Sequence, residues 1–300
     1  MHWFENFETR HFELPQARIH ARVSPGLASG RPVLLLLHGF PQSHVMWHRA
    51  AQALQRDFYL VMPDLRGYGD SSKPAGLPDH STYSKRAMAQ DMVDVMDALG
   101  VERFHVCGHD RGARVAHRLA LDHPARVSRL CVIDIAPTLD MYKATDFAFA
   151  QAYYHWFHLI QPEPLPETMI GGNPLPYLHH KLGGWGTGGL AQIEAAALAE
   201  YERCFVLPGT IHAICEDYRA SACIDLAQDR LSRSQGEKIA CDTLVLWGER
   251  GVVNRLFAPL PLWQAQCAAT VRGQTLAAGH FIPEELPGET AAALSSFMAL

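Results

Sequence analysis

The pattern of apolar and polar residues predicts alternating strands and helices through the first 135 residues. Four apolar runs have the length of strands: Val33–His38, Phe58–Pro63, Phe104–Gly108 and Arg129–Asp134. These runs are too continuous for strands with one face in solvent, so we expect central strands covered on both faces. Helix-like segments lie between them, at residues 44–55, 84–99 and 111–123. Together they predict a doubly wound, mostly parallel sheet with right-handed crossovers.

The alternation stops after residue 134, and residues 138–238 contain no run of the buried-strand type. This segment holds aromatic residues, prolines, a glycine-rich patch from Gly183 to Gly189 and an alanine-rich helix near 190–204. Such a composition predicts a helical segment rather than a continuation of the sheet.

Strand-like runs return at Thr243–Trp247 and near Thr270–Ala277, and a last helix closes the chain. An insertion between two strands is the simplest account of this order. We therefore expect an α/β core of residues 1–137 and 239–300 that carries a helical cap of residues 138–238.

Composition narrows the class of protein. The 300 residues are 48% hydrophobic and 19% charged, as in an ordinary folded enzyme. The net charge of −5 argues against a nucleic-acid or anionic-membrane partner. The strongest apolar stretch, Val33–Leu37, is too short to span a bilayer, and MHWFENFETR lacks a secretory apolar run. Seven cysteines lie scattered without CxxC spacing, so we expect a cytoplasmic protein with reduced cysteines and no zinc site.

The sequence Gly108-His109-Asp110-Arg111-Gly112 follows a predicted buried strand and opens a predicted helix. A turn this tight needs small flanking residues, and it presents its central side chain at the carboxyl edge of the sheet. Serine hydrolases carry serine there, whereas this chain has Asp110. A carboxylate is ionised at neutral pH and can attack carbon without a base. Asp110 could merely cap the next helix, but a cap does not require the flanking glycines. Asp110 is thus the predicted nucleophile.

An attacking carboxylate leaves an ester on the enzyme, and a general base must then activate water to hydrolyse it. Gly279-His280-Phe281 follows the last predicted strand and comes last in the chain order. Both features fit the histidine that acts as general base in this architecture, so we predict that His280 activates the water molecule.

The base needs a carboxylate partner to orient it. The loop after Thr243–Trp247 has glycine where an aspartate is expected, and it offers only Glu249. Asp134 ends the preceding core strand, from which a side chain can also reach the histidine. We take Asp134 as the acid and Glu249 as the reserve. The structural alternative is that Asp134 caps a turn.

The segment His38-Gly39-Phe40-Pro41 follows the strand of leucines. In this architecture the loop supplies one backbone N–H to an oxyanion hole, and the residue after the nucleophile supplies another. We therefore assign the amides of Phe40 and Arg111, which would stabilise the intermediate formed when water attacks the ester. The segment Asp64–Gly69 is predicted to be a supporting turn without chemistry.

Together, His38–Gln42, Asp64–Gly69 and Gly108–Gly112 resemble the dehalogenase and epoxide-hydrolase branch of the α/β hydrolases, over nearly the whole chain. The sequence is most similar to the fluoroacetate (haloacetate) dehalogenases. The residues that carry this similarity are Asp110–Arg114, His155-Trp156 and Glu216–Ala220. One departure is Ala113, where the family usually has a second glycine. The resemblance implies the α/β-hydrolase fold with a helical cap.

The resemblance also implies roles for five residues. Arg111 and Arg114 would hold a substrate carboxylate, for which guanidinium groups are suited. His155, Trp156 and Tyr218 would bind the departing halide through ring N–H and O–H donors. The alternatives are a solvated charge on a helix face for Arg114 and simple packing for the aromatic residues.

Two other function classes stay open. An epoxide hydrolase would use the same aspartate and histidine with a pair of cap tyrosines, to be drawn from Tyr142, Tyr153, Tyr154, Tyr177, Tyr201 and Tyr218. A neutral epoxide gains nothing from two arginines beside the nucleophile, and the same holds for a haloalkane. A non-catalytic binding protein would be expected to lose the nucleophile or the histidine, and both are present.

The resemblance implies a homodimer that hydrolyses a small haloacid to a hydroxy acid such as glycolate and a halide ion. No metal or organic cofactor is expected, because nucleophile, base and anion binders are all side chains or backbone amides. The sequence does not distinguish fluoroacetate from chloroacetate or larger 2-haloacids.

Overall fold

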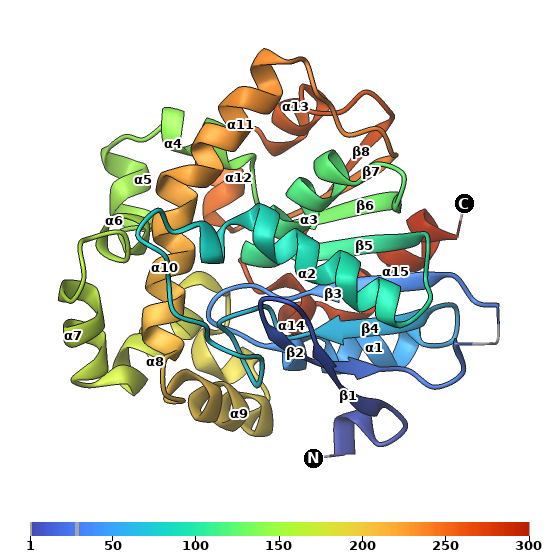
Figure 1. The fold of residues 1–300 in the computed structure, drawn as a ribbon, viewed down its shortest axis with the longest axis horizontal. Coiled ribbons are helices and arrows are strands. Elements are labelled where there is room, and N and C mark those ends of the chain that lie inside the picture. Colours follow the sequence, from blue (N-terminus) through green and yellow to red (C-terminus); the bar gives the residue numbers. More distant parts are fainter. Residues whose placement is uncertain (1, 28–29, 300) are drawn as a thin grey trace.

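The computed structural model describes residues 2–27 and 30–299, and an eight-stranded sheet forms its centre (Figure 1). The strands are β1 (Glu8–Glu13), β2 (Arg18–Val23), β3 (Val33–Leu37), β4 (Tyr59–Pro63), β5 (Phe104–His109), β6 (Val127–Ile133), β7 (Thr243–Gly248) and β8 (Val271–Leu276). Their order in the sheet is β1-β2-β4-β3-β5-β6-β7-β8. The six strands from β4 to β8 in this order all pair in parallel with their neighbours in this group. Strand β2 pairs antiparallel with both β1 and β4. The predicted mostly parallel sheet is confirmed.

The six predicted strands are β3 to β8, and β3 and β4 are buried at every position. The hairpin of β1 and β2 was not predicted from the sequence. Strand β1 lies at the edge of the sheet and is exposed at all positions but Phe12. An edge strand with polar residues has no continuous apolar run, so the criterion that found the central strands could not find it.

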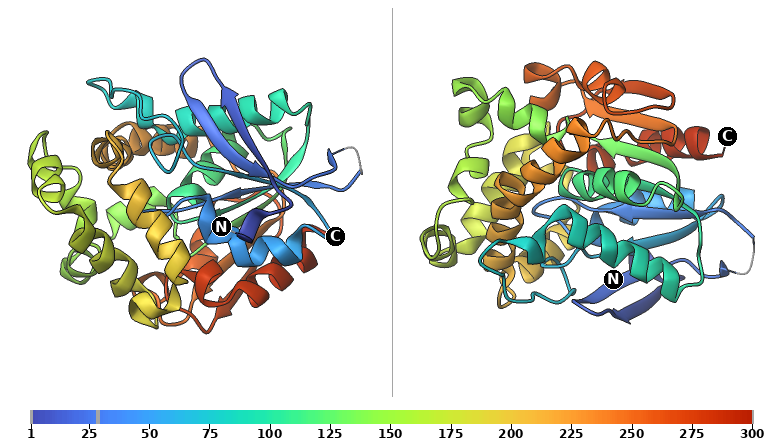
Figure 2. Two further views of the ribbon diagram at one scale, coloured as in Figure 1. Left: turned by 90° about the horizontal axis from the view of Figure 1, so that it is seen from below. Right: turned by 45° about the horizontal axis from the view of Figure 1, so that its top comes forward.

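Helices cover both faces of the sheet. The core helices are α1 (His48–Leu54), α2 (Lys85–Ala98), α3 (Arg111–Asp122), α12 (Val252–Leu256), α13 (Pro259–Gln264), α14 (Ile282–Glu285) and α15 (Pro287–Met298). The 3-10 turns η3 (His44–Trp47) and η4 (Ser81–Tyr83) precede α1 and α2, and η1 (His2–Phe4) precedes β1. Helices α2 and α3 pack together on one face, and α1 packs against α15 on the other (Figure 2, left). The strands between these layers are therefore shielded from water on both sides.

The segment between β6 and β7 is helical, as predicted. It contains α4 (Thr138–Lys143), α5 (Phe147–Ala152), α6 (His155–His158), α7 (Leu165–Gly171), α8 (Pro174–Trp185), η5 (Gly189–Gln192), α9 (Ala195–Phe205), α10 (Thr210–Ala222) and α11 (Ile224–Ser234). Most of these helices gather beyond one end of the strands (Figure 1). The division into core and cap domains stays a prediction. Among the described residues, no helix has the length and apolar character needed to cross a bilayer.

The turn from β5 into α3 is crowded on both sides. A Cβ atom on Gly112 would lie 2.3 Å from the carbonyl oxygen of His38, and one on Gly108 would lie 2.5 Å from the backbone nitrogen of Ala113. Between these glycines, Asp110 has φ 44° and ψ −112°, a conformation that non-glycine residues rarely adopt. Gly112 thus lets α3 approach β3, and Gly108 lets the first turn of α3 fold back on the end of β5, so that Asp110 is held in a tight turn between them.

We predict that Gly112→Ala lowers the free energy of unfolding by about 1–3 kcal/mol, because the added methyl group overlaps backbone that cannot move freely. Denaturant unfolding of the variant and the wild type measures this difference. Gly288→Ala is the matched control, since Gly288 lies in α15 with nothing within 4 Å of an added Cβ. Equal stability of Gly112→Ala and wild type would refute the crowding argument.

Candidate active site

The Asp110 side chain is held at the start of α3, 7% exposed. Its Oδ2 accepts a hydrogen bond of 3.1 Å from the backbone N–H of Phe40, the amide predicted for the oxyanion hole. Its own backbone N–H donates to the carbonyl oxygen of Ile133 at the end of β6. In the described structure the amide of Arg111 makes no hydrogen bond to this carboxylate. The contribution of Arg111 N–H to an oxyanion hole therefore stays a prediction.

His280 and Asp134 form a buried pair. The Nδ1 of His280 lies 2.7 Å from Oδ2 of Asp134, whose Oδ1 accepts from the backbone N–H of Gly248 at 3.0 Å. Asp134 extends from the end of β6 with a positive φ of 52°, which aims its side chain across the top of β7. Glu249, the reserve candidate, is exposed. The structure therefore brings Asp134, and not Glu249, to the histidine.

The loop after β7 leaves room for this pair. A Cβ atom on Gly251 would lie 3.2 Å from Oδ1 of Asp134, so the backbone passes close beside the carboxylate. The glycine that replaced the expected acid in this loop thus accommodates a carboxylate arriving from the neighbouring strand.

Charge sets the protonation of the nucleophile and the base. Burial alone would raise the pKa of Asp110, but the charges of His280 and Arg114 outweigh it, and the pKa falls below its usual 3.8. Burial would lower the pKa of His280, but the hydrogen bond and charge of Asp134 outweigh it, and the pKa rises above its usual 6.5. Asp110 is therefore a carboxylate over the whole range in which His280 titrates.

Arg111 is paired on one side with a carboxylate that was given no role in the sequence analysis. Its Nε donates to Oδ2 of Asp217 at 2.9 Å, and its Nη2 donates to Oδ1 of Asp217 at 2.6 Å and to Oγ of Ser221 at 2.8 Å. Its Nη1 is buried and has no partner among the described residues. One edge of the guanidinium is thus fixed by α10, and the other is left to bind a ligand.

Arg114 has a similar arrangement. Its Nη1 donates to Oγ1 of Thr138 at 2.8 Å and to the carbonyl oxygen of Ala136 at 3.3 Å. Its Nε is buried without a partner in the part of the chain that the structure describes. The side chain is 2% exposed, so it is not a solvated charge on a helix face. Nη1 of Arg111 and Nε of Arg114 are thus two buried cationic donors that lack acceptors.

His155, Trp156 and Tyr218 are also brought to this site. The His155 ring stacks on Phe40 with centroids 5.8 Å apart, and Tyr218 lies 5.5 Å from both rings. Trp156 covers the guanidinium of Arg114 at 4.8 Å. These contacts place α6 and α10 directly over the loop that contacts Asp110.

The same three side chains offer hydrogen-bond donors. Burial lowers the pKa of His155 well below its usual value, so the ring is neutral and carries one N–H. Burial raises the pKa of Tyr218, so its hydroxyl remains protonated, and this hydroxyl has no partner among the described residues. The arrangement can therefore solvate a small anion without water.

Two aromatic residues of the site were not singled out from the sequence. Trp185 lies 4.5 Å from the His155 ring and 5.6 Å from the His280 ring, and its carbonyl oxygen accepts from the backbone N–H of His280 at 2.9 Å. Tyr153 lies 6.5 Å from the His280 ring and was considered only among the tyrosines of the epoxide alternative. Trp185 lies inside the glycine-rich patch Gly183 to Gly189, and a large aromatic residue among glycines was the one sequence feature that could have marked it as a site residue.

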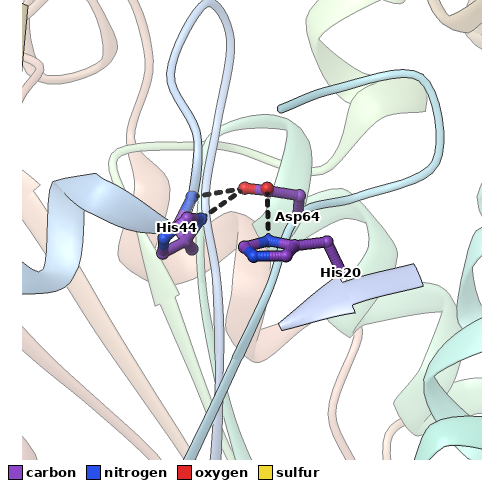
Figure 3. A group of neighbouring side chains, drawn as sticks. All are labelled: His20, His44 and Asp64. Carbon is purple, nitrogen blue, oxygen red and sulfur yellow. Dashed lines mark hydrogen bonds and ion pairs between the residues drawn. The ribbon is translucent and has the colours of Figure 1, made fainter. Parts of the chain in front are cut away.

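One cluster has the residue types of a metal site. His20, His44 and Asp64 offer donor atoms that all lie within 4.8 Å of one another (Figure 3). However, Nδ1 of each histidine lies at hydrogen-bond distance from Asp64, at 2.9 and 2.8 Å. The backbone N–H groups of His44 and Asp70 donate to the same two oxygens. These four donors occupy the carboxylate, so the cluster fastens β2 and η3 to the end of β4.

Comparisons with known proteins agree with this geometry. The family model described as alpha/beta hydrolase fold matches residues 32–287. A fluoroacetate dehalogenase from Burkholderia sp is 44% identical over 296 residues, which cover 99% of this chain and 95% of the relative. A soluble epoxide hydrolase from Corynebacterium sp. (strain C12) is 32% identical over 86% of this chain and 87% of the relative.

A crystal structure from Nostoc sp PCC 7120, provisionally described as an alpha/beta hydrolase, is 54% identical, with a TM-score of 0.94 over 98% of this chain and 99% of that one. The agreement of family model, relatives and solved structure spans the sheet, the turn before α3 and the helical insertion. The chain therefore belongs to the α/β-hydrolase fold family.

Proposed function

We propose that this protein is a hydrolytic dehalogenase that converts fluoroacetate or another haloacetate to glycolate and a halide ion. The observation that carries the proposal is the pair of buried guanidinium donors without acceptors, Nη1 of Arg111 and Nε of Arg114, beside the Asp110 carboxylate. They match a substrate that presents a carboxylate next to its reactive carbon. The name of the Burkholderia relative, fluoroacetate dehalogenase, supports the same substrate class.

In the first step, the substrate carboxylate binds Arg111 and Arg114 and its α-carbon faces Asp110. Because Oδ2 of Asp110 is held by the amide of Phe40, Oδ1 is the attacking atom. A bond forms between Oδ1 and the α-carbon, and the carbon–halogen bond breaks with its electron pair leaving on the halide. Donors on His155, Trp156 and Tyr218 stabilise the growing charge, which matters most for fluoride.

In the second step, His280 removes a proton from a water molecule that attacks the carboxyl carbon of the Asp110 ester. The negative charge develops on Oδ2, which already faces the amide of Phe40. Asp134 stabilises the imidazolium that forms. His280 then gives this proton to the departing glycolate oxygen. The new carboxyl group of Asp110 loses the second proton of the water molecule to solvent, which makes Asp110 a carboxylate again.

The helical segment 138–238 acts in this scheme as a cap. It supplies His155, Trp156 and Tyr218, and it buries Asp110 and His280 so that each is less than a tenth exposed. Exclusion of bulk water strengthens the interactions with both anions and prevents it from solvating fluoride in place of the protein donors. The homodimer and the cytoplasmic location stay predictions.

An epoxide hydrolase is the second candidate, and two tyrosines beside the site support it. The hydroxyls of Tyr153 and Tyr218 are buried without partners among the described residues. The Corynebacterium relative bears that name. The two unpaired guanidinium donors favour the dehalogenase, since a neutral epoxide has no carboxylate and would leave both N–H groups buried without an acceptor.

We predict that the purified protein releases fluoride and glycolate from fluoroacetate and forms no diol from styrene oxide. The reason is that only the haloacetate supplies a carboxylate to Arg111 and Arg114. Fluoride-electrode and chromatographic assays on both substrates under identical conditions measure this. Diol formation without halide release would contradict the proposal and identify the protein as an epoxide hydrolase.

The two chemical steps should respond differently to pH. His280 must be neutral to accept a proton, so hydrolysis of the ester slows as the pH falls through a value above 6.5. Asp110 remains ionised and still attacks, because its pKa lies below 3.8. At about pH 6 the wild type should therefore accumulate the ester, as measured by intact mass after an acid quench.

His280→Ala is the companion variant, and it should accumulate the same adduct on Asp110 at every pH tested. Peptide mapping locates the carboxymethyl group. An unmodified mass under both conditions, with substrate still being consumed, would contradict the covalent route.

Trp156→Phe should reduce defluorination more than dechlorination. The change removes the indole N–H but keeps an aromatic ring over Arg114. Fluoride depends more on hydrogen bonds as it leaves, so we expect a loss of about 10²-fold in kcat for fluoroacetate and a smaller loss for chloroacetate. Equal losses on the two substrates would show that Trp156 does not bind the halide.

A further inference from the structure

Lys181 is a buried cation that the proposed mechanism does not use. It lies in α8 and is 1% exposed. No hydrogen bond or ion pair joins its ammonium group to any of the residues that the structure describes. Buried lysines are rare unless they are paired, because the desolvated charge needs acceptors or an anion.

Three aromatic rings surround the ammonium. Nζ of Lys181 lies 3.6 Å from the centroid of Tyr154, 5.1 Å from Tyr177 and 5.2 Å from Trp185. Ring faces attract a cation, but they do not replace the three acceptors that an ammonium group can bind. Burial lowers the pKa of Lys181 to about 7, which reflects this incomplete compensation. An anion reaching the amine would compensate the charge directly.

The rings around the amine also belong to a cavity and to the candidate active site, although Lys181 itself does not line the cavity. Tyr154 and Tyr177 also line a cavity of about 290 Å³ with His158, Met169 and Ile170. On the inner side, the Trp185 ring contacts the rings of His155 and His280. Two of the three rings around Lys181, those of Tyr154 and Tyr177, therefore line the cavity, and the third, that of Trp185, contacts the active site.

The other titratable groups that face Lys181 do not neutralise it. They are His155, His158, Tyr154 and Tyr177. Burial lowers the pKa of both histidines and raises the pKa of both tyrosines, so all four are uncharged near neutral pH. The whole chain carries a net charge of −5, so an anionic substrate is attracted only where cations gather locally.

We propose that the Lys181 amine is a subsite for small carboxylate anions, which binds haloacetate between the cavity lined by Tyr154 and Tyr177 and the Arg111–Arg114 pair. The proposal rests on the proposed dehalogenase function for the identity of the anion. It adds a residue that selects charged substrates before they reach the nucleophile. The competing explanation is that Lys181 only joins α8 to α6 through its contact with Tyr154.

The reactivity of the amine tests the subsite without any turnover. The chain has five lysines, so peptide mass spectrometry can follow carbamylation by cyanate at each one. A bound carboxylate keeps the Lys181 amine protonated and unreactive. We expect acetate to slow carbamylation of Lys181 about tenfold and acetamide, which has the same shape and no charge, to leave it unchanged. Lys143, exposed on α4, is the control that neither compound should protect.

Two variants complete the test. Lys181→Met keeps a long apolar side chain against the three rings, and Lys181→Arg keeps the charge. For haloacetate we expect kcat/KM to fall about tenfold in the Met variant, mainly through KM, and about twofold at most in the Arg variant. Lys143→Met is the matched control for the loss of one positive charge.

The proposal is overturned if acetate and acetamide protect Lys181 equally, if the amine does not react with cyanate while Lys143 does, or if both Lys181 variants lose activity together with thermal stability. The last outcome would identify a packing role. Failure of dehalogenation with acetate protection intact would instead refute the proposed reaction and leave the anion subsite standing.

Discussion

The site depends on a negative charge kept in a place where water is excluded. Asp110 lies in a tight turn between two glycines, of which Gly112 lets α3 approach β3, and burial by itself would raise the pKa of Asp110. Its carboxylate remains charged because the amide of Phe40 donates to it and because Arg114 and His280 lie near enough to lower its pKa. A buried charge without such compensation would be neutralised or would destabilise the fold. The surrounding cations are therefore required by the nucleophile before any substrate arrives.

The same reasoning explains Asp217. Its carboxylate holds one edge of Arg111, and it is also paired with Lys85 and accepts a hydrogen bond from Tyr68 at 2.6 Å. Burial would raise the pKa of Asp217, but Arg111 and Lys85 hold it well below the usual value. Arg111 is thus fixed in position by α10 and exposes only Nη1, which gives the anion site a defined direction.

The sequence was sufficient to predict the parts of the site that depend on residue spacing or on order along the chain. The turn around Asp110 follows from the spacing of its glycines, and the position of His280 follows from chain order after the last strand. Asp134 could be inferred because the ends of adjacent parallel strands meet at one edge of the sheet.

Other features of the site depend on contacts between distant parts of the chain. The pairing of Arg111 with Asp217 joins residues 106 apart in the chain, and no local sequence pattern indicates it. No local pattern indicates that Trp185 lies at the active site, or that three aromatic rings surround the amine of Lys181. The β1–β2 hairpin escaped prediction because an edge strand needs no apolar run.

In the proposed mechanism the side chain of Asp110 becomes covalently bonded to the substrate carbon. A single turnover of haloacetate in water enriched in heavy oxygen decides this, with excess enzyme and mass spectrometry of the peptide that contains residue 110. Hydrolysis of an ester at its carboxyl carbon places one solvent oxygen in the Asp110 carboxylate, while the glycolate hydroxyl keeps an oxygen from the enzyme. Label in the glycolate hydroxyl and none in Asp110 would show that water attacks the substrate directly, which contradicts the mechanism.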